Sequence, residues 1–201
     1  MNKHVRPEEF IPAVRAPSDL PRRSWTFDEV LKAEAAGVFE PDERFELIDG
    51  ELVLMAAKGI KHELVKTELV MYWGRKRPDS LKFGSETPFR LNLRNVPEPD
   101  FVLFPANLRL VDLSGPAVML AVEVAKSSRS RDLGYKAKLY AQFGVREHWV
   151  IEAETLTTIV HKGPLKQGYS SVHETPPAEL LTPEFAPEMA VRMADLELDA
   201  D

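Results

Sequence analysis

The eight residues from Ala117 to Val124 are Ala-Val-Met-Leu-Ala-Val-Glu-Val, and they carry a single charge, that of Glu123. Gly115-Pro116 precedes this apolar run, and the polar segment Lys126-Ser-Ser-Arg129 follows it closely. A continuous apolar run of this length predicts a strand that is buried on both faces. A carboxylate in such a strand is destabilising by several kcal/mol unless a cation, a metal ion or hydrogen-bond donors lie nearby. Glu123 is therefore the first candidate for a functional residue.

Length and composition predict one globular domain with a full core. The 201 residues are 44% hydrophobic and 29% charged. Cysteine is absent, which excludes disulfides and thiolate metal sites and fits a reducing cytoplasm. No apolar run approaches the roughly 20 residues needed to cross a bilayer, so we expect a cytoplasmic protein without membrane contact. The net charge of −6 argues against indiscriminate nucleic-acid binding, although a local basic patch could still bind phosphates.

Two parts of the chain are expected. Residues 1–24 contain four prolines among scattered charges, which predicts an extended N-terminal arm. Residues 25–198 are expected to form a single domain. Near its start, Thr26 and Glu29 match a capping box, and the short helix that follows is expected to end at Gly37.

A β-hairpin is predicted from Arg44 to Met55, because the apolar residues alternate and Asp49-Gly50 lies where a two-residue turn would. Pairing across that turn places four apolar side chains on one face, those of Phe45, Leu47, Leu52 and Leu54. Glu46 then points away from this apolar face, since successive side chains of a strand alternate.

The remaining elements are predicted from shorter patterns. Apolar residues recur at helical spacing from Lys61 to Lys76, which predicts one long helix with His62 near its start. His62 lies on the same side as Leu69, so it faces either the core or a site. Alternation from Leu81 to Leu93 predicts one or two strands. Further strands are expected at residues 101–104, 147–152 and 156–161, and after them only residues 190–198 are expected to rejoin the body.

Asp100 and Glu123 are expected at or near the ends of consecutive strands. Adjacent strands lie about 4.8 Å apart, so the two carboxylates could converge. Two carboxylates at this separation repel each other and favour a divalent cation, and Mg²⁺ commonly takes one or two carboxylates together with water and phosphate oxygens. Two simpler interpretations remain: Asp100 caps a turn after Pro99, or Glu123 belongs to a buried ion pair.

A helix is predicted from about Asp132 to Phe143. At 100° per residue, Asp132 and Lys136 fall on its apolar stripe, whereas Lys138 lies almost opposite. An inward lysine near Glu123 is either the counter-ion of that glutamate or a catalytic cation that stabilises charge on a phosphate. A third interpretation is an exposed pair of Lys136 with Asp132, worth only about 0.3–0.5 kcal/mol.

A basic patch is predicted around this helix. Five basic residues and one acid lie between Lys126 and Lys138, in a protein that is acidic as a whole. Such a patch attracts phosphates, so Lys126, Arg129 and Arg131 are candidate nucleic-acid-binding residues. The alternative for Arg129 and Arg131 is an ordinary solvated loop.

Several short motifs, taken in order, carry a resemblance to a known family. They are Phe45-Glu-Leu-Ile-Asp-Gly-Glu-Leu-Val53, His62 at the start of a helix, Pro99-Asp100, Glu123-Val124 followed by Ser127, Asp132-Leu-Gly-Tyr-Lys136 with Tyr140, Gly144-Val145 and His148-Trp149. Over residues 25–198 the chain resembles the Uma-two family of bacterial restriction-endonuclease-like proteins, in the PD-(D/E)xK nuclease superfamily. The ordered series is far more specific than any one motif.

The resemblance implies an α/β, restriction-endonuclease-like fold with a mixed central sheet flanked by helices, an N-terminal arm and a hairpin. It also implies metal-dependent hydrolysis of phosphodiester bonds, with Asp100 and Glu123 as metal ligands and Glu46 as a candidate third acid. We expect Mg²⁺ as the cofactor, with Mn²⁺ as a substitute. We also expect a nucleic-acid partner, DNA in particular, and a homodimer.

The sequence departs from the superfamily pattern two residues after the glutamate, where Ala125 replaces the expected lysine. Lys126 does not repair this, because it points to the opposite face of the strand. Lys136 is the natural replacement, and His62 and Asp132 are further candidate site residues. The alternative, from a different functional class, is a non-catalytic protein that keeps the fold for binding or assembly.

Overall fold

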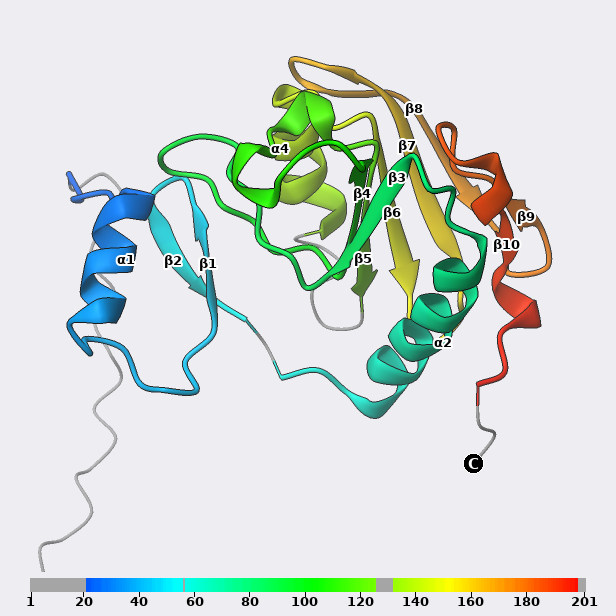
Figure 1. The fold of residues 1–201 in the computed structure, drawn as a ribbon, viewed down its shortest axis with the longest axis horizontal. Coiled ribbons are helices and arrows are strands. Elements are labelled where there is room, and N and C mark those ends of the chain that lie inside the picture. Colours follow the sequence, from blue (N-terminus) through cyan, green and yellow to red (C-terminus); the bar gives the residue numbers. More distant parts are fainter. Residues whose placement is uncertain (1–20, 56, 126–131, 199–201) are drawn as a thin grey trace, which may run out of the picture.

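The computed structural model describes residues 21–55, 57–125 and 132–198, which contain a six-stranded mixed β-sheet with helices on both faces (Figure 1). This confirms the predicted α/β fold with a mixed central sheet flanked by helices. Most of the predicted arm, residues 1–20, lies outside the described residues. The helices and strands are α1 (Phe27–Ala35), β1 (Phe45–Ile48), β2 (Glu51–Leu54), α2 (Ile60–Lys76), β3 (Leu81–Ser85), β4 (Phe101–Pro105), β5 (Leu120–Ala125), α4 (Ala137–Gln142), β6 (Glu147–Glu152), β7 (Thr158–Leu165), β8 (Gly168–Thr175), β9 (Leu180–Leu181) and β10 (Val191–Arg192).

Strand β5 lies inside the sheet, whose order is β3-β4-β5-β6-β7-β8. Strands β5 and β6 are parallel, and all other neighbours in this sheet are antiparallel. A parallel pair needs a crossover connection, which the segment containing α4 provides. All six residues of β5 are buried, which confirms the predicted strand with two covered faces. It begins at Leu120 rather than at Ala117, because Gly115–Ala117 forms a 3₁₀ turn.

Helices α2 and α4 cover opposite faces of the sheet. Val122 of β5 shares a hydrophobic cluster with Trp73 of α2, whereas Ala121 shares another with Tyr140 of α4. Because side chains alternate along a strand, Glu123 faces the side of α4. Within the described ranges, no helix has the length and apolar character that spanning a membrane requires.

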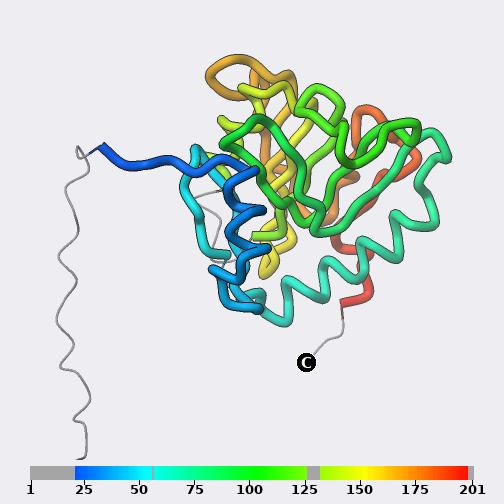
Figure 2. Tube along the Cα trace, turned by 60° about the vertical axis from the view of Figure 1, so that its left-hand side comes forward, coloured from blue at the N-terminus to red at the C-terminus, as the bar shows by residue number. Residues whose placement is uncertain are grey.

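Helix α1 and the β1–β2 hairpin lie beside the main sheet rather than in it (Figures 1 and 2). The hairpin has the predicted register, with Leu47 opposite Leu52. Asp49 and Gly50 have positive φ values of 50° and 77°, the conformation of a type I′ turn. The apolar face of the hairpin packs against α1, so Glu46 points the other way, toward the main sheet.

Three stretches differ from the sequence prediction. Only residues 190–198 were expected to rejoin the body after the last predicted strand, but Leu181, Ala186 and Met189 are also buried in the main core. Of residues 81–93 only Leu81–Ser85 forms a strand, and the chain then leaves the sheet and approaches the hairpin, where the Val96 N–H donates to the Leu47 carbonyl at 2.8 Å. Strand β8 was not predicted, yet it pairs with β7 along the edge of the sheet. Most of its side chains are exposed, so its sequence lacks the apolar alternation that marks a half-buried strand.

Gly50→Ala is expected to destabilise the protein more than Gly37→Ala, although both glycines have positive φ values, of 77° and 70°. A side chain in this conformation is destabilising by roughly 1–2 kcal/mol at either position. At Gly50 the added Cβ would also lie 2.5 Å from Ser24 Cβ, whereas at Gly37 no described atom lies within 4 Å. Urea unfolding of the two variants measures the difference. Equal losses would mean that close packing against Ser24 does not hold the hairpin turn.

Candidate active site

Asp100 and Glu123 lie side by side where β4 begins and β5 nears its end. The two strands pair with Phe101 opposite Val122, and continuing this register sets Asp100 opposite Glu123. The backbone N–H of Val124 donates to Asp100 Oδ2 at 2.8 Å. Each acid is only 5% exposed. Directly opposed residues of an antiparallel pair point to the same face, so the fold brings the two predicted acids together.

Lys136 is ion-paired with Glu123. The Lys136 Nζ lies 2.9 Å from Glu123 Oε1 and 2.9 Å from Glu46 Oε1. The same ammonium lies 3.9 Å from Asp132 Oδ1. The Tyr140 hydroxyl donates to Glu123 Oε1 at 2.9 Å. The hairpin, β5 and the turn before α4 therefore each contribute at least one carboxylate around a single lysine.

A π-helical turn, Asp132–Lys136, presents this lysine at the start of the predicted helix. Turns of this kind are often found at functional sites. Lys136 is 2% exposed, whereas Lys138 is exposed. The predicted orientations of the two lysines, one inward and one outward, are thus confirmed. Ala125 is completely buried behind Glu123 on the same strand face.

Among the described residues, the Lys136 ammonium contacts two buried carboxylates at 2.9 Å, those of Glu123 and Glu46. Burial raises the pKa of Glu123 to about 8, and although Lys136 opposes the shift, three neighbouring carboxylates add to it, those of Asp132, Glu46 and Asp100. Burial alone would lower the pKa of Lys136, but the carboxylates of Glu123 and Glu46 raise it above its ordinary value. The lysine therefore stays charged. Within the described part of the chain, one ammonium shared between the carboxylates of Glu46 and Glu123 leaves a surplus of negative charge that a further cation would neutralise.

Glu46 links the hairpin to this cluster. Its side chain is buried, and its Oε1 accepts a hydrogen bond from the Glu98 N–H at 2.8 Å in addition to the contact with Lys136. Its Oε2 receives no hydrogen bond from the described residues. A buried oxygen without a protein donor is uncommon and often has a water or an ion as its partner. Glu46 therefore has an oxygen available for a ligand.

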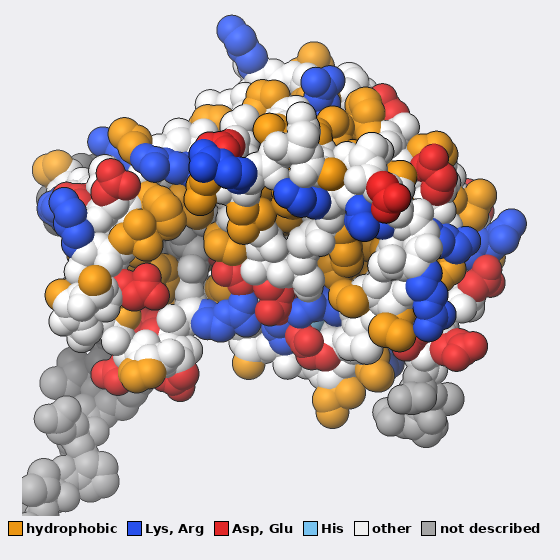
Figure 3. Space-filling view, in the orientation of Figure 1, with side chains coloured by type: hydrophobic (Ala, Val, Ile, Leu, Met, Phe, Trp, Pro, Cys, Tyr) orange, Lys and Arg blue, Asp and Glu red, His pale blue; other side chains and the backbone are white. Residues whose placement is uncertain are grey.

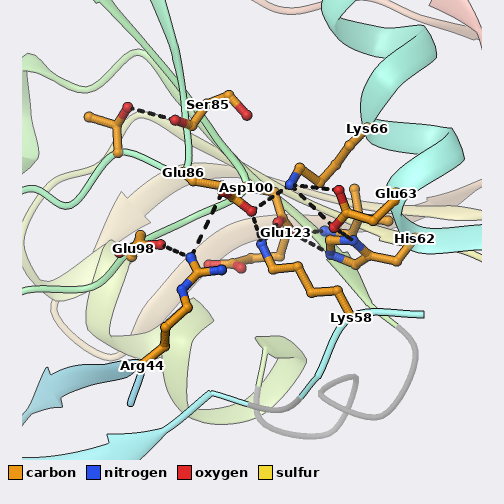
Figure 4. Close-up of polar contacts among 12 residues, drawn as sticks. Arg44, Lys58, His62, Glu63, Lys66, Ser85, Glu86, Glu98, Asp100 and Glu123 are labelled. Carbon is orange, nitrogen blue, oxygen red and sulfur yellow. Dashed lines mark hydrogen bonds and ion pairs between the residues drawn. The ribbon is translucent and has the colours of Figure 1, made fainter. Parts of the chain in front are cut away.

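Asp100 has a histidine and a lysine as neighbours on the side that faces α2 (Figure 4). Its Oδ2 lies 3.2 Å from His62 Nε2, and its Oδ1 accepts a hydrogen bond from Lys58 Nζ at 2.9 Å. Burial raises the pKa of Asp100, but the hydrogen bond and charge of His62, the charge of Lys58 and the Val124 N–H together lower it to about 2. Asp100 is therefore ionised at neutral pH. His62, a candidate from the sequence, contacts Asp100 directly.

Lys58, Lys66 and Glu86 were not identified from the sequence. Glu86 Oε1 is hydrogen-bonded to both lysines, with Lys66 Nζ at 2.5 Å. Helical spacing could have identified Lys66, because it lies one turn after His62 on the buried side of α2. No periodic pattern in the sequence identifies Lys58 or Glu86, because both residues lie outside the helices and strands.

The described residues contain no group of three or more His, Asp or Glu side chains arranged to hold a metal ion. The donor set nevertheless fits Mg²⁺. Asp100, Glu123 and Glu46 present only oxygen atoms, and Mg²⁺ is commonly bound through one or two carboxylates while it keeps several waters. The predicted nucleic-acid-binding residues, Lys126, Arg129 and Arg131, lie outside the described residues.

The mixed sheet, with two acids on adjacent strands and a lysine beside them, fits the restriction-endonuclease-like α/β class that the sequence resembles. Residues 27–195 match the Uma2 (Uma-two) family, described as "Putative restriction endonuclease", and the chain belongs to that family. The fold is similar to a crystal structure from Anabaena variabilis ATCC 29413, described as "a putative nuclease belonging to DUF820". The TM-score is 0.68 at 19% identity, over 85% of this chain and 96% of that one. A comparison with curated proteins finds no match.

The metal-free protein is expected to lose stability relative to Glu123→Gln as the pH rises from about 5 to 8. With the pKa of Glu123 raised from 4.5 to about 8, the folded state keeps a proton that the unfolded state releases above pH 4.5. Stability therefore falls with rising pH across that interval, and glutamine removes the effect. Urea midpoints in EDTA at several pH values measure the difference between the two proteins. A difference that stays constant with pH would contradict the raised pKa.

Proposed function

We propose that the protein is a Mg²⁺-dependent endonuclease that hydrolyses phosphodiester bonds in DNA. The observation that carries the proposal is the convergence of Asp100, Glu123 and Lys136, with Lys136 Nζ 2.9 Å from Glu123 Oε1. The acid pair offers oxygen ligands for a hard cation, and the lysine offers positive charge beside them. Membership of the Uma2 family supports the nuclease class.

Asp100 and Glu123 would hold the metal ion, and Glu46 has an oxygen without a protein donor that is able to contribute. Mn²⁺ suits the same oxygen ligands and should substitute for Mg²⁺. When bound, the ion would neutralise charge on the scissile phosphate and lower the pKa of a water molecule. Its binding would also remove the surplus of negative charge around Glu123, which favours the ionised form of that carboxylate.

Lys136 would stabilise the negative charge that develops on the phosphate oxygens during hydrolysis. A donor fixed in place before the reaction needs no reorganisation, and Lys136 is fixed by its contacts with Glu46 and Glu123. Tyr140 would act as a positioning residue, because its hydroxyl holds the Glu123 oxygen that also contacts the lysine. In this proposal Lys136, on the helix, takes the role of the lysine that the superfamily pattern has at position 125, where this chain has Ala125.

A non-catalytic protein remains the second candidate, and one observation favours it. Each of the two central acids already has a lysine partner, Lys58 at Asp100 and Lys136 at Glu123. Buried ion pairs of this kind can be purely structural. We nevertheless favour the nuclease, because among the described residues the Lys136 ammonium is shared between two buried carboxylates, those of Glu46 and Glu123. A homodimer is proposed as the assembly, since one site cuts one strand and a duplex requires two.

Mg²⁺ is expected to raise the melting temperature of the parent protein, and Asp100→Asn and Glu123→Gln should each lose that rise. A ligand that binds only the folded state stabilises it by mass action, so removal of a ligand carboxylate abolishes the effect. Asp112→Asn is the matched control, because Asp112 is an acid in an exposed pair with Arg109. Differential scanning fluorimetry with and without Mg²⁺ provides the measurement. An equal rise in all four proteins would count against a metal site at Asp100 and Glu123.

Lys136→Gln is expected to reduce Mg²⁺-dependent cleavage of DNA by a hundredfold or more, about the effect of losing one fixed transition-state donor. Lys138→Gln should change little, because Lys138 is exposed. Loss of one partner of a buried ion pair also destabilises a protein by about 3–5 kcal/mol, so both variants are compared at a temperature where circular dichroism shows them folded.

A second variant tests whether Lys136 replaces the lysine expected at position 125. Residue 125 projects from the same face as Glu123, so Ala125→Lys combined with Lys136→Gln should recover part of the cleavage. Recovery should be incomplete, because Ala125 is fully buried and overpacking is destabilising by roughly 1–3 kcal/mol. Comparable losses in Lys136→Gln and Lys138→Gln, or a folded double variant without recovery, would refute the role given to Lys136.

A further inference from the structure

Three cationic side chains from separate segments converge on one carboxylate, that of Glu86. Lys58 precedes α2, Lys66 lies within α2, and Arg44 precedes β1. Glu86 Oε1 accepts hydrogen bonds from Lys58 and, at 2.5 Å, from Lys66. Glu86 Oε2 lies 3.9 Å from the Arg44 guanidinium, which is also hydrogen-bonded to Glu98, and Lys66 Nζ lies 3.4 Å from Glu63 Oε2. Lysine and arginine together are the usual ligands of phosphate groups as well as of carboxylates.

The backbone holds Glu86 in an unfavourable conformation. Its φ value is 47°, a left-handed conformation that a glutamate rarely adopts. The Glu86 N–H donates to the Asp100 carbonyl at 3.0 Å, which fixes the residue at the point where β3 ends beside Asp100. Non-glycine residues held in this conformation are found most often at ligand sites and switches. Together with the three cations around it, this conformation makes the Glu86 side chain a candidate for a role in ligand binding.

The place where the cations meet is open to solvent and adjoins the candidate active site. The side chains of Glu86 and Arg44 are 34% and 48% exposed, whereas Lys58 and Lys66 are largely covered. Acidic and basic side chains lie together in the recess between the hairpin layer and α2 (Figure 3). Lys58 contacts Glu86 and Asp100 Oδ1 at once, so this cluster directly borders the proposed metal ligands (Figure 4).

We propose that Arg44, Lys58 and Lys66 form a phosphate-binding subsite for the DNA backbone, and that the Glu86 carboxylate occupies it until DNA binds. The inference rests on the proposed function and names residues that would position its substrate. A backbone phosphate carries one negative charge, as Glu86 does, so the exchange leaves the charge of the subsite unchanged. Because the Glu86 side chain is partly exposed, its carboxylate can rotate toward solvent when a phosphate takes its place.

Binding of a short fluorescein-labelled DNA duplex tests the subsite without cleavage, because anisotropy is measured in EDTA. Lys58→Gln and Arg44→Gln should each weaken binding by about three- to tenfold and reduce the salt dependence by roughly one phosphate contact. Glu86→Gln should strengthen binding by about three- to tenfold, because the competing anion is gone. Asp112→Asn makes the same charge change in an exposed pair and should alter binding less than twofold.

The sign of the Glu86→Gln effect separates the proposal from a structural role. Glu86→Gln removes the partner of two lysines, so a purely structural carboxylate would give unchanged or weaker binding. Either of those results, or a gain matched by Asp112→Asn, would overturn the subsite. Unchanged binding in both Lys58→Gln and Arg44→Gln would do the same. The proposed function is tested separately. If the parent protein cleaves DNA with Mg²⁺, the nuclease function stands whatever the Glu86→Gln result. If the parent protein neither binds nor cleaves DNA, both the nuclease function and the phosphate subsite are refuted.

Discussion

One buried ammonium, that of Lys136, lies between carboxylates that the chain delivers from distant places. Its contacts with Glu123 and Glu46, both at 2.9 Å, connect the middle of the main sheet to the separate β1–β2 hairpin. Breaking a buried pair by removing one partner leaves an uncompensated charge, which is destabilising by about 3–5 kcal/mol. The arrangement of β5, the π-helical turn and the hairpin therefore depends on this lysine, and so does the shape of the candidate site.

A second set of ion pairs complements this one on the other side of Asp100. Lys58 connects Asp100 to Glu86, and Lys66 and Arg44 complete the set around Glu86. Among the described residues, the lysine of the first set is shared between two buried carboxylates, whereas in the second set three cations meet at Glu86 and each also pairs with one further acid, Glu98, Asp100 or Glu63. On the proposed function, the first set would hold a metal ion, and the second would take up a phosphate once the Glu86 carboxylate moves away. A metal-dependent nuclease needs both properties within a few ångströms, because its substrate is an anion that must approach bound metal.

Local patterns predicted the parts of this site that belong to regular elements. The apolar run placed Glu123 on a buried strand, helical spacing turned Lys136 inward, and the Asp49-Gly50 turn fixed the hairpin register and hence the direction of Glu46. The contacts of Lys58 and Glu86 could not be predicted in the same way. Both residues lie in irregular segments, and the positive φ of Glu86 has no signal in the sequence. Strand β8 was missed because its exposed edge position removes the apolar alternation.

The most direct test of the central claim is the anomalous scattering of Mn²⁺ in crystals of the parent protein, with Asp112→Asn and Glu123→Gln crystals treated alike. The account predicts one anomalous peak in contact with the carboxylates of Asp100 and Glu123, with the Lys58 ammonium moved away from Asp100. The peak should persist in Asp112→Asn and disappear in Glu123→Gln. Mn²⁺ bound only elsewhere, with Lys58 still on Asp100 and Lys136 still on Glu123, would contradict the account and leave both ion pairs as structural features.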